Sequence, residues 1–167
     1  MGPMALTLDD VEEEAVAEEI RILGTNDVGV LERVAPDVFD EPVDARWSAE
    51  FLADPRHHLV VALDGEVVVG FASAVHYVHP DKPAELWINE VGVAPTHQGR
   101  GIGKRLLAAL FVRARELGCG EAWVLTEYDN TAARRLYAAA GGEESPEPTL
   151  MITFPLRSTP DDENDGA

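Results

Sequence analysis

The pattern of apolar and β-branched residues predicts a sheet of short strands. The runs 58–63 and 66–72 flank Asp64 and Gly65, and two β-branched runs around Asp-Gly predict a hairpin. The region 75–83 fits a loop or a strand end. Further apolar runs predict strands at 19–23, 85–93, 122–126 and 150–154.

Helical spacing and capping residues predict helices between these strands. The longest helix covers 101–117, where one face carries Ile102, Leu106, Leu107, Leu110 and Ala114. Ser, Asp and Asn side chains cap helices because they accept hydrogen bonds from the first free N–H groups. Such residues predict three shorter helices: from Asn26 or Asp27 to about residue 35, after Ser48, and from Asp129 or Asn130 to Gly141.

The length of 167 residues predicts one domain with its own core. We expect an acidic extension at 1–17, a folded domain at 18–155 and an acidic, disordered tail at 156–167. The single cysteine, Cys119, excludes a disulfide framework and suits a reducing compartment. No stretch is long and apolar enough for a membrane span, and the N-terminus has no basic-then-apolar signal, so the expected location is cytoplasmic.

The formal charge of −18 argues against nucleic acid as a partner, because like charges repel and no basic stripe occurs. The same charge is compatible with a cationic small-molecule substrate. Many of the acidic residues lie at the two ends of the chain, where solubility or a salt-adapted source explains them equally well. His76, His79 and His97 form no metal pattern with nearby Cys or carboxylates, so we expect no metal.

A glycine-rich turn at 98–103 joins the strand 85–93 to the longest helix. Such a turn points successive N–H groups into one concavity beside the positive end of the helix, which predicts a phosphate-bearing ligand. The chain lacks the Gly-x-x-x-x-Gly-Lys-Ser/Thr string of the P-loop, and the alternating glycines of the turn do not fit the dinucleotide fingerprint. The turn does fit Gln/Arg-x-x-Gly-x-Gly/Ala, the pattern that binds the pyrophosphate of coenzyme A, at Gln98, Gly101 and Gly103. The alternative is a plain turn at the start of a helix.

The segments 89–95, 98–103 and 130–141 resemble the GCN5-related N-acetyltransferase (GNAT) superfamily. The resemblance implies an α/β (α+β) fold: a mixed, mostly antiparallel sheet with helices on both faces and a splayed pair of central strands. It also implies acetyl-CoA as the cofactor, with pantetheine entering between the splayed strands. The implied cofactor-binding residues are Val91, Gly92, Val93, Gln98, Gly99, Arg100, Gly101, Ile102, Gly103, Lys104 and Asn130.

Two residues are candidates for the proton transfers that acetylation of an amine requires. Glu90 lies in an apolar strand beside the implied pantetheine path, which makes it the candidate base unless its carboxylate simply faces solvent. The resemblance places Tyr137 beside the sulfur of coenzyme A as the candidate acid; the alternative is a core-facing aromatic. Asn130 can instead serve only as a helix cap, and Arg100 and Lys104 can belong to a solvated helix face.

The candidate acceptor-binding residues are four acids that could line a cleft: Asp40, Glu41, Glu127 and Asp129. A closer resemblance, to the aminoglycoside 3-N-acetyltransferases of the superfamily, rests on residues 38–40, 51–53, 67–70, 85–93 and 126–130. Those enzymes carry an Asp where this chain has Glu90, and Glu keeps the carboxylate but adds a methylene.

The resemblance therefore implies N-acetylation of a polycationic small molecule, in particular an aminoglycoside at its 3-N position. The alternatives are acetylation of another small amine or of a peptide N-terminus, and a non-catalytic module that binds acyl-CoA. A homodimer is an alternative to a monomer. Neither nucleic acid nor a membrane is an expected partner.

Overall fold

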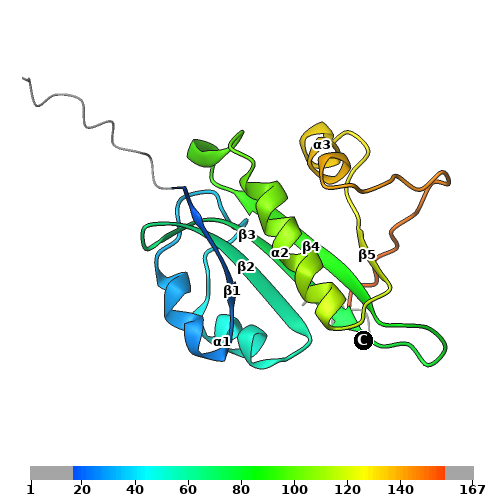
Figure 1. The fold of residues 1–167 in the computed structure, drawn as a ribbon, viewed down its shortest axis with the longest axis horizontal. Coiled ribbons are helices and arrows are strands. Elements are labelled where there is room, and N and C mark those ends of the chain that lie inside the picture. The colour runs from blue at the N-terminus through cyan, green and yellow to red at the C-terminus, as the bar shows by residue number, and fades with distance from the viewer. Residues whose placement is uncertain (1–16, 157–167) are drawn as a thin grey trace, which may run out of the picture.

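The computed structural model describes residues 17–156, so most of the expected acidic extension and nearly all of the expected tail lie outside the described residues. One five-stranded sheet carries the fold, and helices lie on both of its faces (Figure 1). The elements, in chain order, are β1 Glu19–Leu23, η1 Thr25–Glu32, α1 Ala45–Ala53, β2 His57–Asp64, β3 Val67–Tyr77, β4 Glu85–Val93, η2 Pro95–His97, α2 Ile102–Glu116, β5 Glu121–Val124 and α3 Thr131–Ala139.

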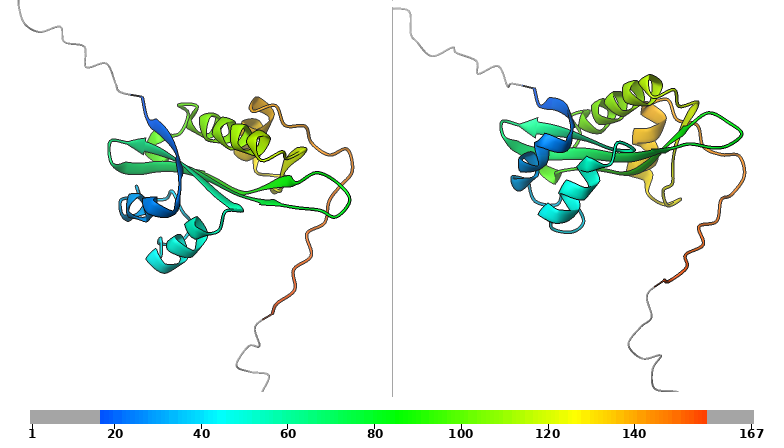
Figure 2. Two further views of the ribbon diagram at one scale, coloured as in Figure 1. Left: turned by 60° about the horizontal axis from the view of Figure 1, so that its bottom comes forward. Right: turned by 90° about the horizontal axis from the view of Figure 1, so that it is seen from below.

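The strands follow chain order across the sheet, from β1 at one edge to β5 at the other. The pairs from β1 to β4 are antiparallel, and β5 pairs with β4 in parallel. The predicted mixed, mostly antiparallel sheet is therefore confirmed. Figure 2 shows η1 and α1 below the sheet and α2 above it, which confirms the prediction of helices on both faces.

The predicted hairpin is confirmed as β2 and β3. The turn residues are Gly65 and Glu66, one position later than the Asp-Gly pattern suggested, because β2 includes Asp64. Gly65 has a φ of 60°, which a glycine adopts at little cost. β3 continues to Tyr77, through residues that the sequence left as a loop or strand end.

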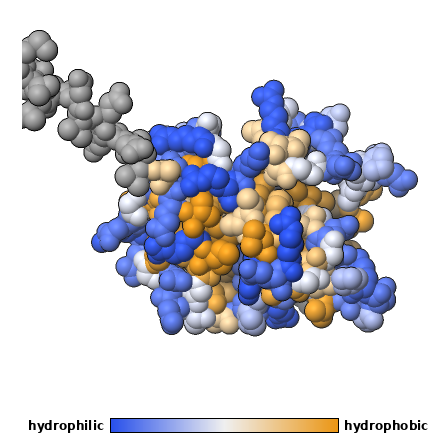
Figure 3. Space-filling view, in the orientation of Figure 1, coloured by the Kyte–Doolittle hydropathy of each residue, from blue (hydrophilic) through white to orange (hydrophobic). Residues whose placement is uncertain are grey.

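The main core lies between α2 and the sheet. The apolar face of α2 is buried as its helical spacing predicts, and Leu106, Leu107 and Leu110 are fully inaccessible. α2 approaches β3 closely at Gly70, where an added Cβ would lie 3.2 Å from the Ile102 side chain. Outside this core, Figure 3 shows hydrophilic residues around much of the face turned to the viewer, with apolar residues between them.

In the segment before β2, two helices begin differently from what the sequence predicts. The helix expected from Asn26 or Asp27 is the 3₁₀ helix η1, and the Asp27 carboxylate accepts a hydrogen bond from the Gly24 N–H at 2.7 Å. The prediction that Ser48 caps the next helix is wrong. Asp44 is the N-cap of α1, and its carboxylate accepts from the Trp47 N–H at 3.0 Å.

The strand predicted at 150–154 is also wrong, since this segment pairs with no strand in the described part of the chain. Its apolar side chains are exposed: 85% for Leu150, 71% for Ile152 and 76% for Phe154. Composition indicates a preference for extended backbone, but a strand forms only where a partner satisfies its N–H and C=O groups. In Figure 2 the segment leads away from the sheet.

Candidate active site

The central strands β4 and β5 diverge after a short paired stretch. β5 pairs only with Glu85 to Ile88 of β4, and β4 then continues to Val93 without a partner on that side among residues 17–156. Figure 1 shows β5 leading away toward α3. One backbone edge of β4 is therefore open over 89–93, and unpaired backbone groups at such an edge can pair with an extended ligand chain such as pantetheine.

The turn between β4 and α2 forms an anion cradle. Gly99 and Gly101 have φ values of 77° and 76°, in the left-handed region that favours glycine. α2 begins at Ile102, and no side chain in the described part of the protein caps its first N–H groups. Free amides at a helix N-terminus, preceded by a left-handed turn, suit a phosphate group. The residues present therefore fit the pyrophosphate of coenzyme A.

The polar side chains of this turn have different surroundings. Gln98 donates from Nε2 to the Val93 carbonyl at 3.1 Å, which ties the turn to the end of β4. Arg100 donates to the Thr96 carbonyl at 3.1 Å and lies 3.4 Å from the Glu18 carboxylate. Lys104 is exposed and has no ion-pair partner among residues 17–156.

Three of the proposed cofactor residues also have a packing role. An added Cβ at Gly92 would lie 2.3 Å from the Val38 carbonyl oxygen, and one at Gly103 would lie 3.0 Å from the Leu136 side chain. Gly92 therefore allows close packing of the η1–α1 loop on β4, and Gly103 allows α3 to approach α2. The Ile102 side chain is buried in the core, so only its backbone can face a ligand.

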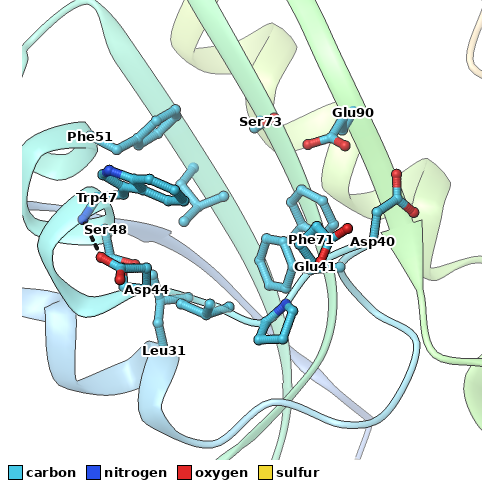
Figure 4. Close-up of a pocket in the computed structure, with 14 residues that line it drawn as sticks. Leu31, Asp40, Glu41, Asp44, Trp47, Ser48, Phe51, Phe71, Ser73 and Glu90 are labelled. Carbon is cyan, nitrogen blue, oxygen red and sulfur yellow. Dashed lines mark hydrogen bonds between the residues drawn. The ribbon is translucent and has the colours of Figure 1, made fainter. Parts of the chain in front are cut away.

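A pocket of about 380 Å³ lies on the opposite face of the sheet from α2, between α1, the loop before it and strands β3 and β4 (Figure 4). This volume is in the range of small-molecule sites. The apolar lining residues are Leu31, Phe39, Pro42, Val43, Trp47, Phe51, Leu59 and Phe71. The polar lining residues are Asp40, Glu41, Asp44, Ser48, Ser73 and Glu90.

Glu90 reaches this pocket because of a bulge in β4. Ser73 pairs with Glu90 while its neighbour Ala74 pairs with Ile88, so Asn89 is left without a partner. Figure 4 shows the Glu90 carboxylate beside Ser73 and facing Asp40. Glu90 is exposed as a residue, but partial desolvation of its carboxylate in the pocket raises its pKa, and the negative charge of Asp40 raises it further. A carboxylate with a raised pKa is a better proton acceptor at neutral pH.

Two of the four predicted acceptor-binding acids meet in this pocket and two do not. Asp40 and Glu41 line it together with Glu90. Glu127 and Asp129 lie in the exposed loop between β5 and α3, away from the lining residues.

Four further residues line the same pocket without having been predicted from the sequence: Asp44, Trp47, Phe51 and Ser73. The spacing of Trp47 and Phe51 by four residues was an available signal, because it places two aromatic rings on one helix face. Nothing in the local sequence marked Ser73.

The two predicted site residues on α3 have different environments. The Asn130 side chain accepts a hydrogen bond from the Ala133 N–H at 3.1 Å and so caps the helix. Tyr137 is half-buried, and burial raises the pKa of its hydroxyl, so it remains protonated at neutral pH. Within residues 17–156, no cluster of His, Cys, Asp and Glu could hold a metal ion, and no helix has the length and hydrophobicity to cross a membrane.

Comparison with known proteins agrees with this geometry. Residues 28–141 match the model of the Acetyltransferase (GNAT) family. The chain belongs to this family. Its fold is the GNAT fold.

Individual relatives differ in what they act on. The chain is 39% identical to N-alpha-acetyltransferase RimI of Mycobacterium tuberculosis over 104 aligned residues. The alignment covers 62% of this chain and 63% of the relative. It is 35% identical over 86 residues to a mycothiol acetyltransferase of Saccharopolyspora erythraea, covering 50% of this chain and 26% of the relative. The chain thus spans less than two thirds of the length of these relatives.

A solved structure shares the fold over most of the chain. It is the aminoglycoside acetyltransferase meta-AAC0020 from an uncultured soil metagenomic sample, in complex with sisomicin. The TM-score is 0.70, with 20% sequence identity, and the match covers 84% of this chain and 97% of that chain. At this identity the likeness concerns the fold.

Proposed function

We propose that the protein transfers the acetyl group of acetyl-CoA to an amine of a cationic small molecule bound in the pocket. The observation that carries this proposal is the position of Glu90. Its carboxylate lines the pocket, and the open backbone edge of β4 begins beside it and leads to the cradle at 98–103. The acceptor side and the cofactor side of the site therefore meet at one strand.

Bound acetyl-CoA supplies the activated acetyl group, and the residues of this chain handle the protons. Glu90 takes a proton from the acceptor ammonium, which frees the nitrogen lone pair to attack the acetyl carbonyl. The C–N bond forms and the C–S bond breaks, the nitrogen releases its second proton to solvent, and Glu90 later returns its own proton to solvent. Tyr137 donates its hydroxyl proton to the departing sulfur and regains one from solvent. Partial desolvation of both groups raises their pKa values, so Glu90 holds a proton more readily and Tyr137 begins protonated.

The finer hypothesis is an aminoglycoside acceptor, acetylated at its 3-N position. It is supported by the sequence resemblance around Glu90 and by the carboxylates of Asp40, Glu41 and Asp44 at the same pocket. Carboxylates concentrate and orient a polycation. A structural neighbour was solved with sisomicin, but the shared fold does not transfer its substrate.

A peptide N-terminus is a second candidate, favoured by the 39% identity to an N-alpha-acetyltransferase. Both acceptors present an amine that is mostly protonated at neutral pH, so both require the base. The two acceptors differ in the rest of the molecule: a peptide offers one amine at the end of an extended chain, whereas an aminoglycoside is a polycation.

Release of free thiol from acetyl-CoA in the presence of an amine panel tests the proposal. The panel contains kanamycin, gentamicin, spermidine and a short peptide with a free N-terminus. Glu90→Gln should lower turnover by about 10²–10⁴-fold, and the loss should shrink at high pH, where the free amine needs no base. Glu127→Gln, which changes an exposed Glu outside the pocket, is the matched control. Acetyl-CoA binding without turnover of any amine would instead support the non-catalytic module.

A further inference from the structure

The pocket has two unlike sides. Figure 4 shows Trp47 and Phe51, both from α1, on one side, and the carboxylates of Glu90 and Asp40 on the other. Phe71 lies between them. The Asp44 carboxylate lies at the aromatic end, where it is engaged as the cap of α1. A ligand that fills the pocket therefore meets mainly aromatic rings at one end and the carboxylates of Glu90 and Asp40 at the other.

The aromatic side is held in place by the surrounding structure. Phe51 stacks on His57 with ring centroids 4.7 Å apart, and Phe39 stacks on Phe71 at 3.9 Å. The Trp47 backbone is fixed by its hydrogen bond to the Asp44 cap, yet the residue remains 67% exposed. An exposed tryptophan beside a cavity offers a large apolar contact surface that the protein itself leaves uncovered.

The lining limits the chemistry of the ligand that can fill the pocket. Hydroxyl groups on the part of a ligand that faces Phe39, Phe51 and Phe71 would find no hydrogen-bond partner on those rings, which is unfavourable. An apolar ring would gain contact area instead. The cation belongs at Glu90 and Asp40, because only that side offers opposite charge next to the open edge of β4.

We propose that the acceptor is an amine with an apolar, ring-bearing body, an arylalkylamine in its simplest form, and that Trp47 selects it. The amine nitrogen lies at Glu90 and the ring lies against Trp47 and Phe51. This inference rests on the proposed function and narrows its substrate class. It favours an apolar amine over a hydroxyl-rich aminoglycoside as the better acceptor.

Two matched amines test the role of the ring. Phenethylamine and 2-methoxyethylamine both carry a primary amine, but only the first has an aromatic body. The expected result is a kcat/KM at least tenfold higher for phenethylamine than for 2-methoxyethylamine or kanamycin. Equal values for the two small amines, or a preference for kanamycin, would overturn the proposal.

Variants of Trp47 test the selecting residue. Trp47→Ala should raise the KM for phenethylamine about tenfold, with kcat nearly unchanged and no effect on 2-methoxyethylamine or acetyl-CoA. Trp47→Phe should recover most of the loss because it keeps an aromatic ring. Trp87→Ala is the control, since Trp87 is also partly exposed but stacks on Trp123 outside the pocket. Equal effects of the two alanine variants would contradict the assignment.

Direct binding separates this inference from the proposed function. Isothermal titration calorimetry of phenethylamine needs no turnover, so it reports on the pocket even if no amine is acetylated. Binding that weakens about tenfold in Trp47→Ala, together with an absence of thiol release, supports the pocket and overturns the acetyl transfer. Thiol release with small amines that does not depend on Trp47 would support the acetyl transfer and overturn the role of Trp47 in selecting the acceptor.

Discussion

The carboxylate of Glu90 is tuned by its position in the fold, and this predicts a pH-dependent effect on stability. Its pKa is raised in the folded state, so the folded protein binds the proton more tightly than the unfolded chain does. Stability from this group is therefore present below the unfolded pKa of about 4.5 and is lost as pH rises through the folded pKa. Glu90→Gln should raise Tm at pH 8 and leave it unchanged at pH 4.

Thermal unfolding of both proteins at the two pH values measures this effect. Glu127→Gln, in an exposed loop, controls for the loss of one negative charge from an already acidic chain. A Tm difference that is the same at pH 4 and pH 8 would show that Glu90 is not strained in its charged form. Such a result would also weaken its assignment as a base with a raised pKa.

The proposed role of the Tyr137 hydroxyl as proton donor can be tested by removing that hydroxyl alone. Tyr137→Phe keeps the ring and removes only the hydroxyl proton, so it should lower kcat by about 10²–10⁴-fold while acetyl-CoA affinity stays nearly constant. Steady-state kinetics and calorimetry measure the two quantities separately. If kcat is unchanged, Tyr137 is one of the aromatic residues that pack on the core and has no catalytic role.

His58 predicts how the protein responds to acid. The ring is buried, and its Nε2 lies 2.8 Å from Nδ1 of His76. Burial is the main cause that lowers the pKa of His58 to about 4, and the positive charges of His76, Arg113 and His57 lower it further. The folded state therefore binds fewer protons than the unfolded chain between about pH 6.5 and 4, and stability falls as pH drops through this window. His58→Gln, which can still hydrogen-bond to His76, should reduce the drop in Tm between pH 7 and pH 4.5.

At the scale of elements, the packing of the η1–α1 loop on β4 depends on Gly92. An added methyl group would lie 2.3 Å from the Val38 carbonyl oxygen and 2.7 Å from the Phe71 ring, so the loop or the ring must move. Gly92→Ala should cost about 1–3 kcal/mol in the free energy of unfolding, as overpacking does elsewhere. Chemical denaturation measures this cost, and Gly29→Ala is the control because its Cβ would meet nothing within 4 Å.

The sequence predicted the elements that local signals determine. The β2–β3 hairpin and α2 were found because alternation, a turn dipeptide and helical spacing are written in consecutive residues. The start of α1 was misplaced because Asp44 and Ser48 are both good caps, and only the folded backbone chooses between them. The strand at 150–154 failed because pairing depends on a partner elsewhere in the chain.

The glycine-rich turn at the start of α2 could be predicted from sequence, whereas the shape of the pocket could not. Gln98 to Gly103 are contiguous, so their spacing carried the information. The pocket joins Trp47 from α1, Phe71 from β3 and Glu90 from β4, and it depends on the unpaired Asn89 that turns Glu90 toward it. A bulge of this kind depends on strand register, which the pattern of apolar residues in β4 alone does not specify.

At the scale of the whole molecule, binding of coenzyme A must stabilise the folded state if the cradle is real. A ligand at 100 times its dissociation constant adds about 2.7 kcal/mol when it binds only the folded protein. For a chain of this size, such a gain corresponds to a rise in Tm of about 5–10 °C. Thermal unfolding with and without acetyl-CoA measures it, and no response in the unmodified protein would contradict the cradle.

Two glycines with the same backbone geometry make the test specific to the cradle. Gly101 and Gly118 have φ values of 76° and 74°, and an added Cβ at either position would meet nothing within 4 Å. Leucine at either position therefore introduces similar left-handed backbone strain and should lower the basal Tm by a similar amount. Only Gly101→Leu places a side chain where the pyrophosphate would lie. It should abolish the rise in Tm with acetyl-CoA, while Gly118→Leu, at the far end of α2, should retain it. A loss of response in both variants would mean that strain, and not access to the cradle, controls binding.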